Sequence, residues 1–293
     1  MADASMSESW PAPAKLNLFL HVIGRRPDGY HELQTAFQLI DLADELRFRV
    51  RDDPGIRRTA GPELVPPGED LAVRAAQRLQ QAAGIRRGAD IALTKRIPVG
   101  GGLGGGSSDA ATTLVALNEL WGLGWSPERL GTLALELGAD VPVFVRGHSA
   151  WAGGVGEQLE PLPLPERYYA VVFPGVAVST AAVFQAPELT RNTPRTTIRA
   201  FLEAGGRNDC APVVARRYPA VAEALAWLSR GGEARLTGTG SCVFAAFADR
   251  SSARAALAAL PARWSGFVVR GLQRSPLLAR LAAQRASRNE RAE

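Results

Sequence analysis

The chain has few of the residues from which disulfide frameworks and metal sites are built. Its 293 residues include two cysteines, Cys210 and Cys242, and three histidines that are scattered along the sequence. No CxxC pair is present, so neither a disulfide scaffold nor a zinc site is indicated, and no metal-ligating residue is predicted. We expect both cysteines to be buried as small apolar side chains in a reducing cytoplasm.

Long hydrophobic runs are also missing. No apolar stretch approaches the roughly 18 residues of a membrane span, and the first ten residues, MADASMSESW, lack the basic and apolar regions of a secretory signal. Gly and Pro together number 50, below the fraction of about 25–30% that is typical of low-complexity chains. The sequence therefore predicts a globular cytoplasmic protein of about two domains, with no membrane partner.

Lysine is unusually rare. Of the 34 basic residues only Lys15 and Lys95 are lysine, and the others are arginine. A lysine ammonium is a compact charge, whereas arginine presents a wide fork. Each of the two lysines is therefore a candidate for a specific role beside a carboxylate or a phosphate.

The excess of positive charge is local. The net charge is +5, but residues 270–293 hold six arginines and two glutamates, which leaves the rest of the chain close to neutral. We interpret this stretch as a solvated helix end and expect no nucleic-acid partner.

Alternating and helical patterns predict a sequence of mixed elements. Residues 15–23 alternate as a half-buried strand, which places Lys15 and Asn17 on one face. The other expected strands cover residues 34–50, 89–97, 141–145, 168–173, 233–237, 241–248 and 266–271. The expected helices cover residues 70–83, 107–121, 127–137, 197–204, 219–229, 251–260 and 276–286.

This order of elements favours the α+β class over a doubly wound sheet. A cluster of prolines at positions 161, 163 and 165 precedes the strand at 168–173. We place the domain boundary there, with an N-terminal domain over residues 1–160 and a C-terminal domain over 161–293.

A glycine-rich loop, PVGGGLGGGSS at 98–108, lies between a predicted strand and a predicted helix. Such a loop lets backbone N–H groups approach a phosphate, and the helix N-terminus adds unpaired donors. We expect Ser107 or Ser108 to cap the helix, Asp109 to lie in its first turn, and the serine hydroxyls to be available to phosphate or Mg²⁺.

Other glycine-loop classes fit less well. No lysine follows the last glycine, so the Walker A pattern fails. A GxGxxG match is trivial in such a run, and the acidic residue that a dinucleotide site needs is not at the end of a second strand. A protein kinase is not indicated either, since its HRD and DFG motifs are missing.

Two further segments are candidates for the site. In GADVP (138–142), Asp140 stands before an apolar stretch, where a partly desolvated carboxylate could accept a proton from an alcohol; a helix cap or an ion-pair partner is the plainer interpretation. The glycine-rich LTGTGSCVF (236–244) could wrap a substrate or simply form a hairpin turn.

Taken in order, PAKLNLFL, GYHEL, PVGGGLGGGSS, LGADVPVFVRG and LTGTGSCVF resemble the GHMP small-molecule kinases from about residue 10 to 280. PAKLNL, GYHEL and PELTRNTP are more specific, and are similar to the members that phosphorylate a cytidine-diphosphate-linked methylerythritol on its tertiary 2-hydroxyl, in the non-mevalonate route to isoprenoids. The resemblance implies a two-domain GHMP kinase fold, with ATP and substrate in the interdomain cleft and Mg²⁺ accompanying ATP.

The resemblance also implies residue roles. The family's catalytic lysine and aspartate fall on Lys15 and Asp140. Cytosine recognition falls on Tyr30, His31 and Phe184, and contacts to the methylerythritol fall on Asn17 and Thr180. The ATP loop falls on Pro98, Val99, Gly100, Gly101, Gly102, Leu103, Gly104, Gly105, Gly106, Ser107 and Ser108.

Two other functions stay open from the sequence. One is a GHMP kinase of the homoserine or mevalonate type, against which the GYH segment and Phe184 argue. The other is a nucleotide sensor without catalytic activity, against which the presence of both Lys15 and Asp140 argues. The sequence does not indicate an oligomeric state.

Overall fold

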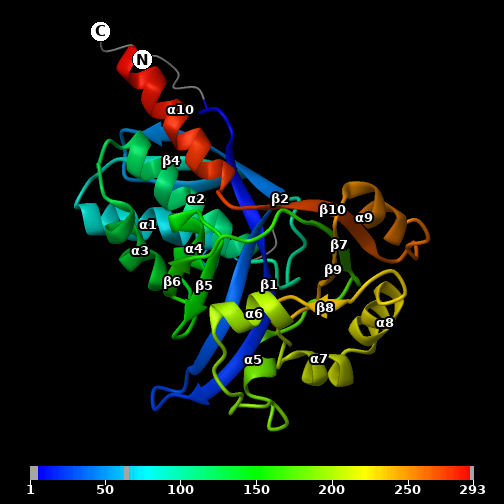
Figure 1. Cartoon of the computed structure of the whole chain (residues 1–293). Coiled ribbons are helices and arrows are strands. Elements are labelled where there is room, and N and C mark those ends of the chain that lie inside the picture. The colour runs from blue at the N-terminus through cyan, green and yellow to red at the C-terminus, as the bar shows by residue number, and fades with distance from the viewer. Residues whose placement is uncertain (1–5, 63–65, 67, 291–293) are drawn as a thin grey trace.

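A long antiparallel hairpin forms the centre of the molecule (Figure 1). Its strands are β1 (Trp10–Arg25) and β2 (His31–Arg51), and they are paired along almost their whole length. The computed structural model describes residues 6–62, 66 and 68–290. Strand β1 is buried on both faces over most of its length, as is β2 over residues 34–40, whereas the alternation in residues 15–23 predicts burial on one face.

The hairpin belongs to a ten-stranded sheet whose main path runs β3-β4-β2-β10-β7-β9-β8. Most pairs are antiparallel; β3 and β4 are parallel. Strands β1 and β5 also pair with β2, and β6 pairs with β5. The remaining strands are β3 (Ile56–Ala60), β4 (Gly88–Thr94), β5 (Ala150–Gly153), β6 (Gln158–Pro161), β7 (Tyr168–Phe173), β8 (Arg235–Leu236), β9 (Val243–Phe247) and β10 (Ser265–Leu272).

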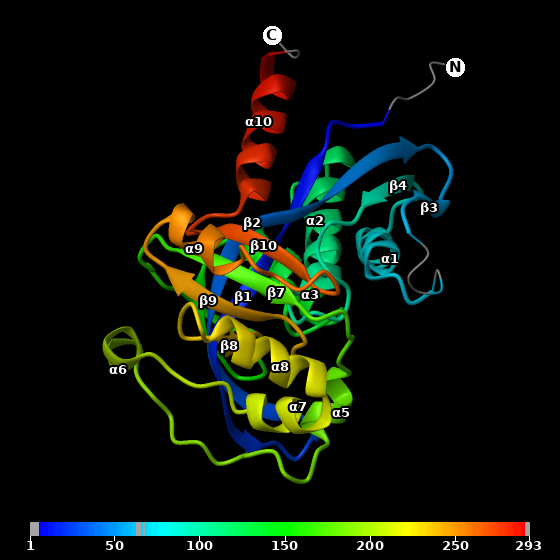
Figure 2. The ribbon, with the colours of Figure 1, turned by 90° about the vertical axis from the view of Figure 1, so that its right-hand side faces the viewer.

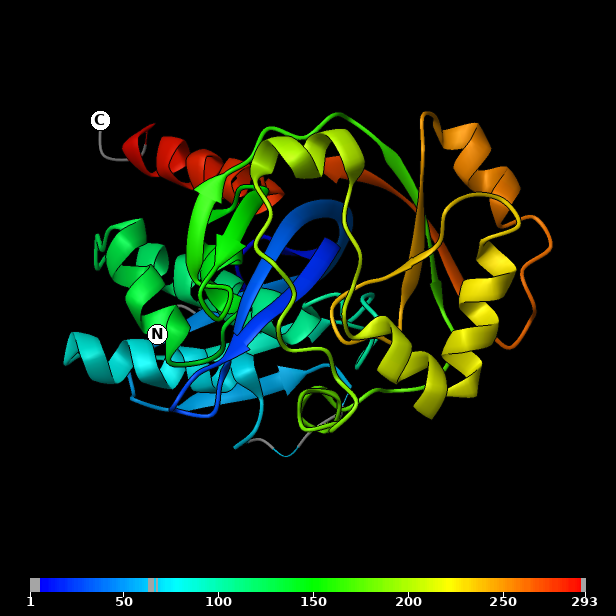
Figure 3. The same cartoon turned by 60° about the horizontal axis from the view of Figure 1, so that its bottom comes forward.

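The helices fall on two sides of the hairpin, as Figure 3 shows. Helices α1 (Leu71–Ala83), α2 (Gly105–Leu120), α3 (Pro127–Leu135) and α4 (Val141–Arg146) gather on the side of β4, and α2 packs against β1 and β2. The other side holds α5 (Thr180–Phe184), α7 (Ala211–Arg217), α8 (Pro219–Leu228) and α9 (Arg250–Ala256). Helix α6 (Ile198–Ala204) lies near the hairpin, and α10 (Pro276–Glu290) ends the described chain. No described helix is long and apolar enough to cross a membrane.

Each side has its own apolar core, and a third cluster lies between them. The first core includes Phe48, Leu79 and Leu114, and the second includes Val172, Val214 and Leu228. The third cluster packs β1, the residue before the glycine loop and the middle of that loop against β7, β9 and β10, through Leu16, Ile97, Leu103, Val171, Phe244 and their neighbours. This third cluster fixes the glycine loop relative to both halves of the molecule.

The α+β class and most predicted elements are confirmed. Helix α1 begins after Asp70, whose carboxylate accepts the N–H groups of Ala72 and Val73, and ends at Gly84 with φ 63°. Ser126 caps α3 through its side chain, which accepts the N–H of Arg129. The sequence patterns missed the short elements β3, β5, β6, α5 and α7. The domain boundary at residues 160/161 stays a prediction.

One predicted element and one predicted helix start are wrong. Residues 141–145 form helix α4, not a strand: Pro142 suits the first turn, and Gly147 at φ 67° ends the helix. Helix α2 begins at Gly105, because Gly104 with φ 73° takes the N-cap position that was expected for Ser107 or Ser108. Asp109 consequently lies beyond the first turn.

The arginine-rich stretch is more than a solvated helix end. Figure 2 shows α10 standing out from the body beside β1 and α2. Arg285 and Arg288 form ion pairs at 2.9 and 3.0 Å with Glu119, whose side chain is only 6% exposed. Arg280 lies over the Trp10 ring at 4.8 Å. Arg291 and Glu293 lie outside the described residues.

This pairing predicts a stability effect. Replacing both Arg285 and Arg288 by alanine leaves the buried Glu119 carboxylate without a cation, which we expect to lower the free energy of unfolding by about 1–3 kcal/mol. Urea denaturation measures the change. Arg199→Ala is the control, since Arg199 forms an exposed i,i+4 pair with Glu203 and should cost about 0.5 kcal/mol or less. Equal effects of the two changes would contradict the assignment.

Candidate active site

Lys15 is a buried cation that joins three elements. Its side chain is 3% exposed, and its Nζ donates to Asn17 Oδ1 at 2.5 Å and to the Gly102 carbonyl at 3.0 Å. The third partner is Asp140 Oδ2 at 3.3 Å. The predicted placement of Lys15 and Asn17 on one face of the strand is confirmed, since the two side chains are hydrogen-bonded.

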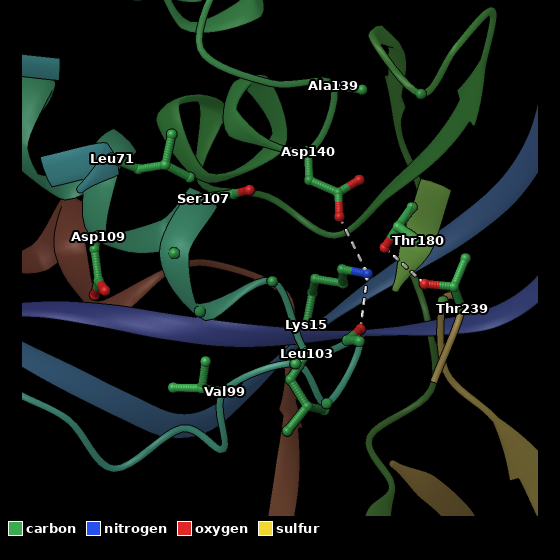
Figure 4. Close-up of a pocket in the computed structure, with 18 of the residues that line it drawn as sticks. Lys15, Leu71, Val99, Leu103, Ser107, Asp109, Ala139, Asp140, Thr180 and Thr239 are labelled. Atoms are coloured by element: carbon green, nitrogen blue, oxygen red, sulfur yellow. Dashed lines mark hydrogen bonds and ion pairs between the residues drawn. The ribbon is translucent and has the colours of Figure 1, made fainter. Parts of the chain in front are cut away.

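Asp140 directs its carboxylate at Lys15 rather than at its own helix. It occupies the N-cap position of α4 but makes no side-chain cap hydrogen bond, so the plain interpretation as a helix cap is wrong and only its alternative, an ion-pair partner, is observed. The side chain is 36% exposed and lines a cavity of about 530 Å³. Figure 4 shows the Asp140 carboxylate pointing at the Lys15 ammonium, with a dashed line for the ion pair.

The glycine loop crosses the floor of the same cavity, and two of its positions require glycine. A Cβ on Gly102 would lie 2.3 Å from the Thr237 carbonyl oxygen, and one on Gly104 would lie 2.9 Å from the Phe144 ring; both residues also have φ near 74°. Ser241 and Cys242 donate their N–H groups to the carbonyls of Gly100 and Gly101. The segment LTGTGSCVF thus packs directly against the glycine loop. The sequence alone left open whether this segment contributes to the site or is only a hairpin turn.

The two serines at the start of α2 have different environments. Ser108 is fully buried, and its hydroxyl donates to the Pro13 carbonyl at 2.6 Å. Ser107 lines the cavity. Ser107 is therefore available to a phosphate or a cation, whereas Ser108 links α2 to β1.

Three of the five predicted substrate residues line the cavity, namely Asn17, Thr180 and Phe184. Thr180 is hydrogen-bonded to Thr239 at 2.9 Å. Asn17 uses both ends of its amide inside the protein, since its Nδ2 donates to Thr35 at 3.0 Å.

The three residues expected to recognise cytosine are only partly assembled. His31 stacks on Phe184 with ring centroids 5.1 Å apart, and α5 contributes Phe184. Tyr30 is 63% exposed near the tip of the β1–β2 hairpin, so it is not a core aromatic residue, and it does not line the cavity. Their roles stay predictions.

The sequence patterns missed a second buried cation site. Lys95 forms ion pairs with Asp44 and, at 2.8 Å, with Asp109. Lys95 and Asp109 both line the cavity. The rarity of lysine singled out Lys95, but no spacing pattern indicated its two carboxylate partners.

The two carboxylates of this site differ. Asp44 also accepts the backbone N–H groups of Arg96 and Ile97, whereas Asp109 Oδ1 is buried without a hydrogen-bond partner. Burial raises the pKa of Asp109 to about 7, against the opposing charge of Lys95. Asp44 and Asp109 raise the pKa of Lys95 despite its burial.

Comparisons with known proteins decide the family. Residues 70–148 match the GHMP kinases N terminal domain, and residues 188–266 match the GHMP kinases C terminal domain. The 4-diphosphocytidyl-2-C-methyl-D-erythritol kinase of Alkalilimnicola ehrlichii is 60% identical over 283 residues, which cover 97% of both chains. The chain belongs to the 4-diphosphocytidyl-2-C-methyl-D-erythritol kinase family of GHMP kinases.

Solved structures agree with this membership. A crystal structure of 4-(cytidine 5'-diphospho)-2C-methyl-D-erythritol kinase superposes with a TM-score of 0.78 at 38% identity, covering 90% of this chain and 98% of the other. The mevalonate kinase of L. major has a TM-score of 0.65 at 16% identity, covering 94% and 98%, which shows a shared fold alone. The predicted GHMP kinase fold and the prediction of an ATP-dependent kinase of this family are confirmed.

Lys15 gives the first prediction for the site. Lys15→Met removes the cation that contacts Asp140, and we expect turnover to fall by about 100-fold or more. Lys15→Arg should recover little of it, because three acceptors converge on one nitrogen and a wide guanidinium does not fit them. Steady-state kinetics measure both variants, with circular dichroism as the folding control. Full activity of Lys15→Arg would show that charge alone matters.

Asp109 gives a prediction on pH. Its pKa is raised in the folded state from 3.8 to about 7, so between these values the folded protein binds more protons than the unfolded one and loses stability as the pH rises. Asp109→Asn cannot titrate. Between pH 4.5 and 7.5 the free energy of unfolding of the wild type should therefore fall by about 1 kcal/mol or more relative to that of Asp109→Asn. Urea denaturation measures both.

A surface aspartate provides the control for this experiment. The pKa of Asp249 is lowered to about 2, mainly by its hydrogen bond from Ser251, so it is already ionised in both states over this pH range. Asp249→Asn should leave the pH dependence of stability unchanged. The same slope in wild type and Asp109→Asn would contradict the raised pKa of Asp109.

Proposed function

We propose that this chain transfers the γ-phosphoryl group of ATP to the tertiary 2-hydroxyl of 4-diphosphocytidyl-2-C-methyl-D-erythritol, a step of the non-mevalonate route to isoprenoid precursors. The observation that carries the proposal is the Lys15–Asp140 pair at 3.3 Å in a cavity floored by the glycine loop. Relatives at 55–60% identity bear the name of this kinase, which supports the substrate.

The glycine loop and α2 hold the phosphates of ATP. The first N–H groups of a helix have no partners within the helix and bear a partial positive charge. At α2 these groups begin at Gly105, beside a loop whose Gly100–Leu103 carbonyls are bonded to neighbouring elements. This arrangement leaves N–H groups for the phosphate oxygens, as at other phosphate-binding helix ends.

Lys15 and Asp140 act on the acceptor alcohol. Asp140 orients the 2-hydroxyl and takes its proton as the oxygen attacks the γ-phosphorus and the bond to the ADP oxygen breaks. Lys15 holds the carboxylate in place and compensates negative charge where the phosphoryl group and Asp140 approach each other. Most of the acceleration comes from positioning, because phosphoryl transfer needs little covalent help.

The residues present fit a Mg²⁺ ion that arrives with ATP. Mg²⁺ in such sites takes one or two protein oxygens and several from phosphates and water. The Ser107 hydroxyl lines the cavity and would supply one protein oxygen. Among the described residues no group of three or more His, Cys, Asp or Glu side chains forms a metal cage. When bound, the ion neutralises phosphate charge.

The two ends of the substrate would bind at different places. We assign the methylerythritol to Asn17 and Thr180, which line the cavity, and the cytosine to Phe184, which lines it too, together with Tyr30 and His31 outside the lining. The Tyr30 side chain is exposed and free to fold over a base. A cytoplasmic location, a small-molecule partner and no nucleic-acid or membrane partner complete the proposal.

A substrate panel tests the activity. The purified chain is incubated with ATP, Mg²⁺ and one alcohol at a time: the CDP-linked methylerythritol, homoserine or mevalonate. We expect ADP release with the CDP-linked alcohol alone, and competition by CMP against that alcohol but not against ATP. ADP release with homoserine or mevalonate would favour the other kinase classes. ATP binding without any turnover would favour a sensor.

Asp140→Asn tests the proton acceptor. The amide keeps the size of the side chain but cannot take the proton, so we expect kcat to fall by roughly 10²–10⁴-fold while the Kd for ATP changes little. Single-turnover kinetics and ATP titration measure the two quantities. Turnover like that of wild type in the folded variant would reduce Asp140 to an ion-pair partner of Lys15.

A further inference from the structure

The segment that follows α5 has no helix or strand from residue 185 to 197, and Arg191 binds its first part to the end of α5. Its Nη2 donates to the carbonyls of Phe184 at 2.9 Å and Ala186 at 2.6 Å. Its Nη1 donates to the Leu189 carbonyl at 3.0 Å. One guanidinium thus gathers three carbonyls and fixes the chain on which Phe184 stands.

The same guanidinium reaches across to the β1–β2 hairpin. Arg191 Nε donates to His31 Nε2 at 3.0 Å, between residues 160 positions apart. Because Nε2 accepts this hydrogen bond, it bears no proton, and the proton of the neutral ring lies on Nδ1. No described residue is hydrogen-bonded to Nδ1, so this N–H is open to a ligand.

The surroundings of His31 keep the ring neutral. Burial lowers the pKa of His31, and the charges of Arg191 and Arg25 lower it further. The neighbouring Glu32 on β2 is paired with Arg195. His31 therefore presents a single donor, and its face stacks on the Phe184 ring at an interplanar angle of 27°.

We propose that Arg191 is a positioning residue for pyrimidine recognition: it fixes His31 as the Nδ1–H tautomer and Phe184 as its stacking partner. This inference rests on the proposed function, since it concerns the base of that substrate. An N–H donor suits N3 of cytosine, which is an acceptor, and opposes N3 of uracil, which is a donor. Arg191 thereby favours a cytidine over a uridine compound without touching the reacting phosphate.

Arg191→Met and Arg191→Lys test the proposal by kinetics. We expect each to raise KM for the CDP-linked alcohol by about ten-fold or more, while kcat and the KM for ATP change by no more than about two-fold, because Arg191 lies outside the cavity lining. Lysine should not rescue KM, since one ammonium cannot serve three carbonyls and an imidazole.

Arg217→Gln is the matched control. Arg217 donates to the Ala182 carbonyl and forms an ion pair with Glu188, so it braces the same stretch of chain without touching His31. Its loss should leave KM for the CDP-linked alcohol and the preference for CMP over UMP in competition unchanged. Each Arg191 variant should reduce that preference.

Nitrogen-15 NMR of the imidazoles reports the tautomer of His31, which should not change if Arg191 has only a structural role. The wild type should show His31 protonated at Nδ1, assigned by loss of its signals in His31→Gln. In Arg191→Met this tautomer should be lost and the pKa of His31 should rise, because a neighbouring cation is removed. Arg191→Lys should keep the low pKa but not the tautomer.

The outcomes separate this inference from the proposed function. If wild type phosphorylates the CDP-linked alcohol and the Arg191 variants keep its KM or the tautomer, the role of Arg191 is wrong and the function stands. If kcat and thermal stability fall in the variants and both KM values rise, Arg191 is only structural. If wild type neither turns over the alcohol nor binds CMP, both proposals fail.

Discussion

The site depends on burying the Lys15 ammonium among acceptors from three different elements. A buried ammonium is costly unless its donors are satisfied, and here Asn17, the Gly102 carbonyl and Asp140 satisfy it. The strand, the glycine loop and the start of α4 must therefore meet at one point. The backbone adds a second tie between the same strand and loop, since Lys15 N donates to the Leu103 carbonyl at 3.0 Å.

The sequence predicted best where the structural signal is local. The expected helix at 70–83 agrees with α1 to within one residue, because the capping residues Asp70 and Gly84 act within one turn. Residues 141–145 were predicted as a strand because five consecutive apolar residues have no period, and a buried helix looks the same. Glycine in the left-handed conformation at Gly104, rather than a serine hydroxyl, begins α2, and a glycine-rich run does not show which glycine will do so.

The sequence predicts which residues form the candidate site but not how they are arranged. Lys15 and Asp140 were named from a rare residue type and a family resemblance, and nothing in the sequence measures the 3.3 Å between them. The contacts of Arg191 with His31 and of Lys95 with Asp44 escaped because each joins segments that are far apart in the sequence, and each residue alone is an ordinary polar or charged residue. Such contacts depend on how separate elements pack, which periodicity and capping do not specify.

The choice between lysine and arginine follows the shape of each cation site. The chain uses arginine almost everywhere, and its two lysines both stand in the cavity lining against carboxylates. Lys15 and Lys95 each place one compact charge where several acceptors converge on a single point. Arg191 instead spans three carbonyls and an imidazole nitrogen that lie apart from one another, which only a planar fork can reach at once. The chain therefore places a point charge where acceptors converge and a rigid, directional donor where they lie apart, and exchanging the two residue types between these sites should impair both.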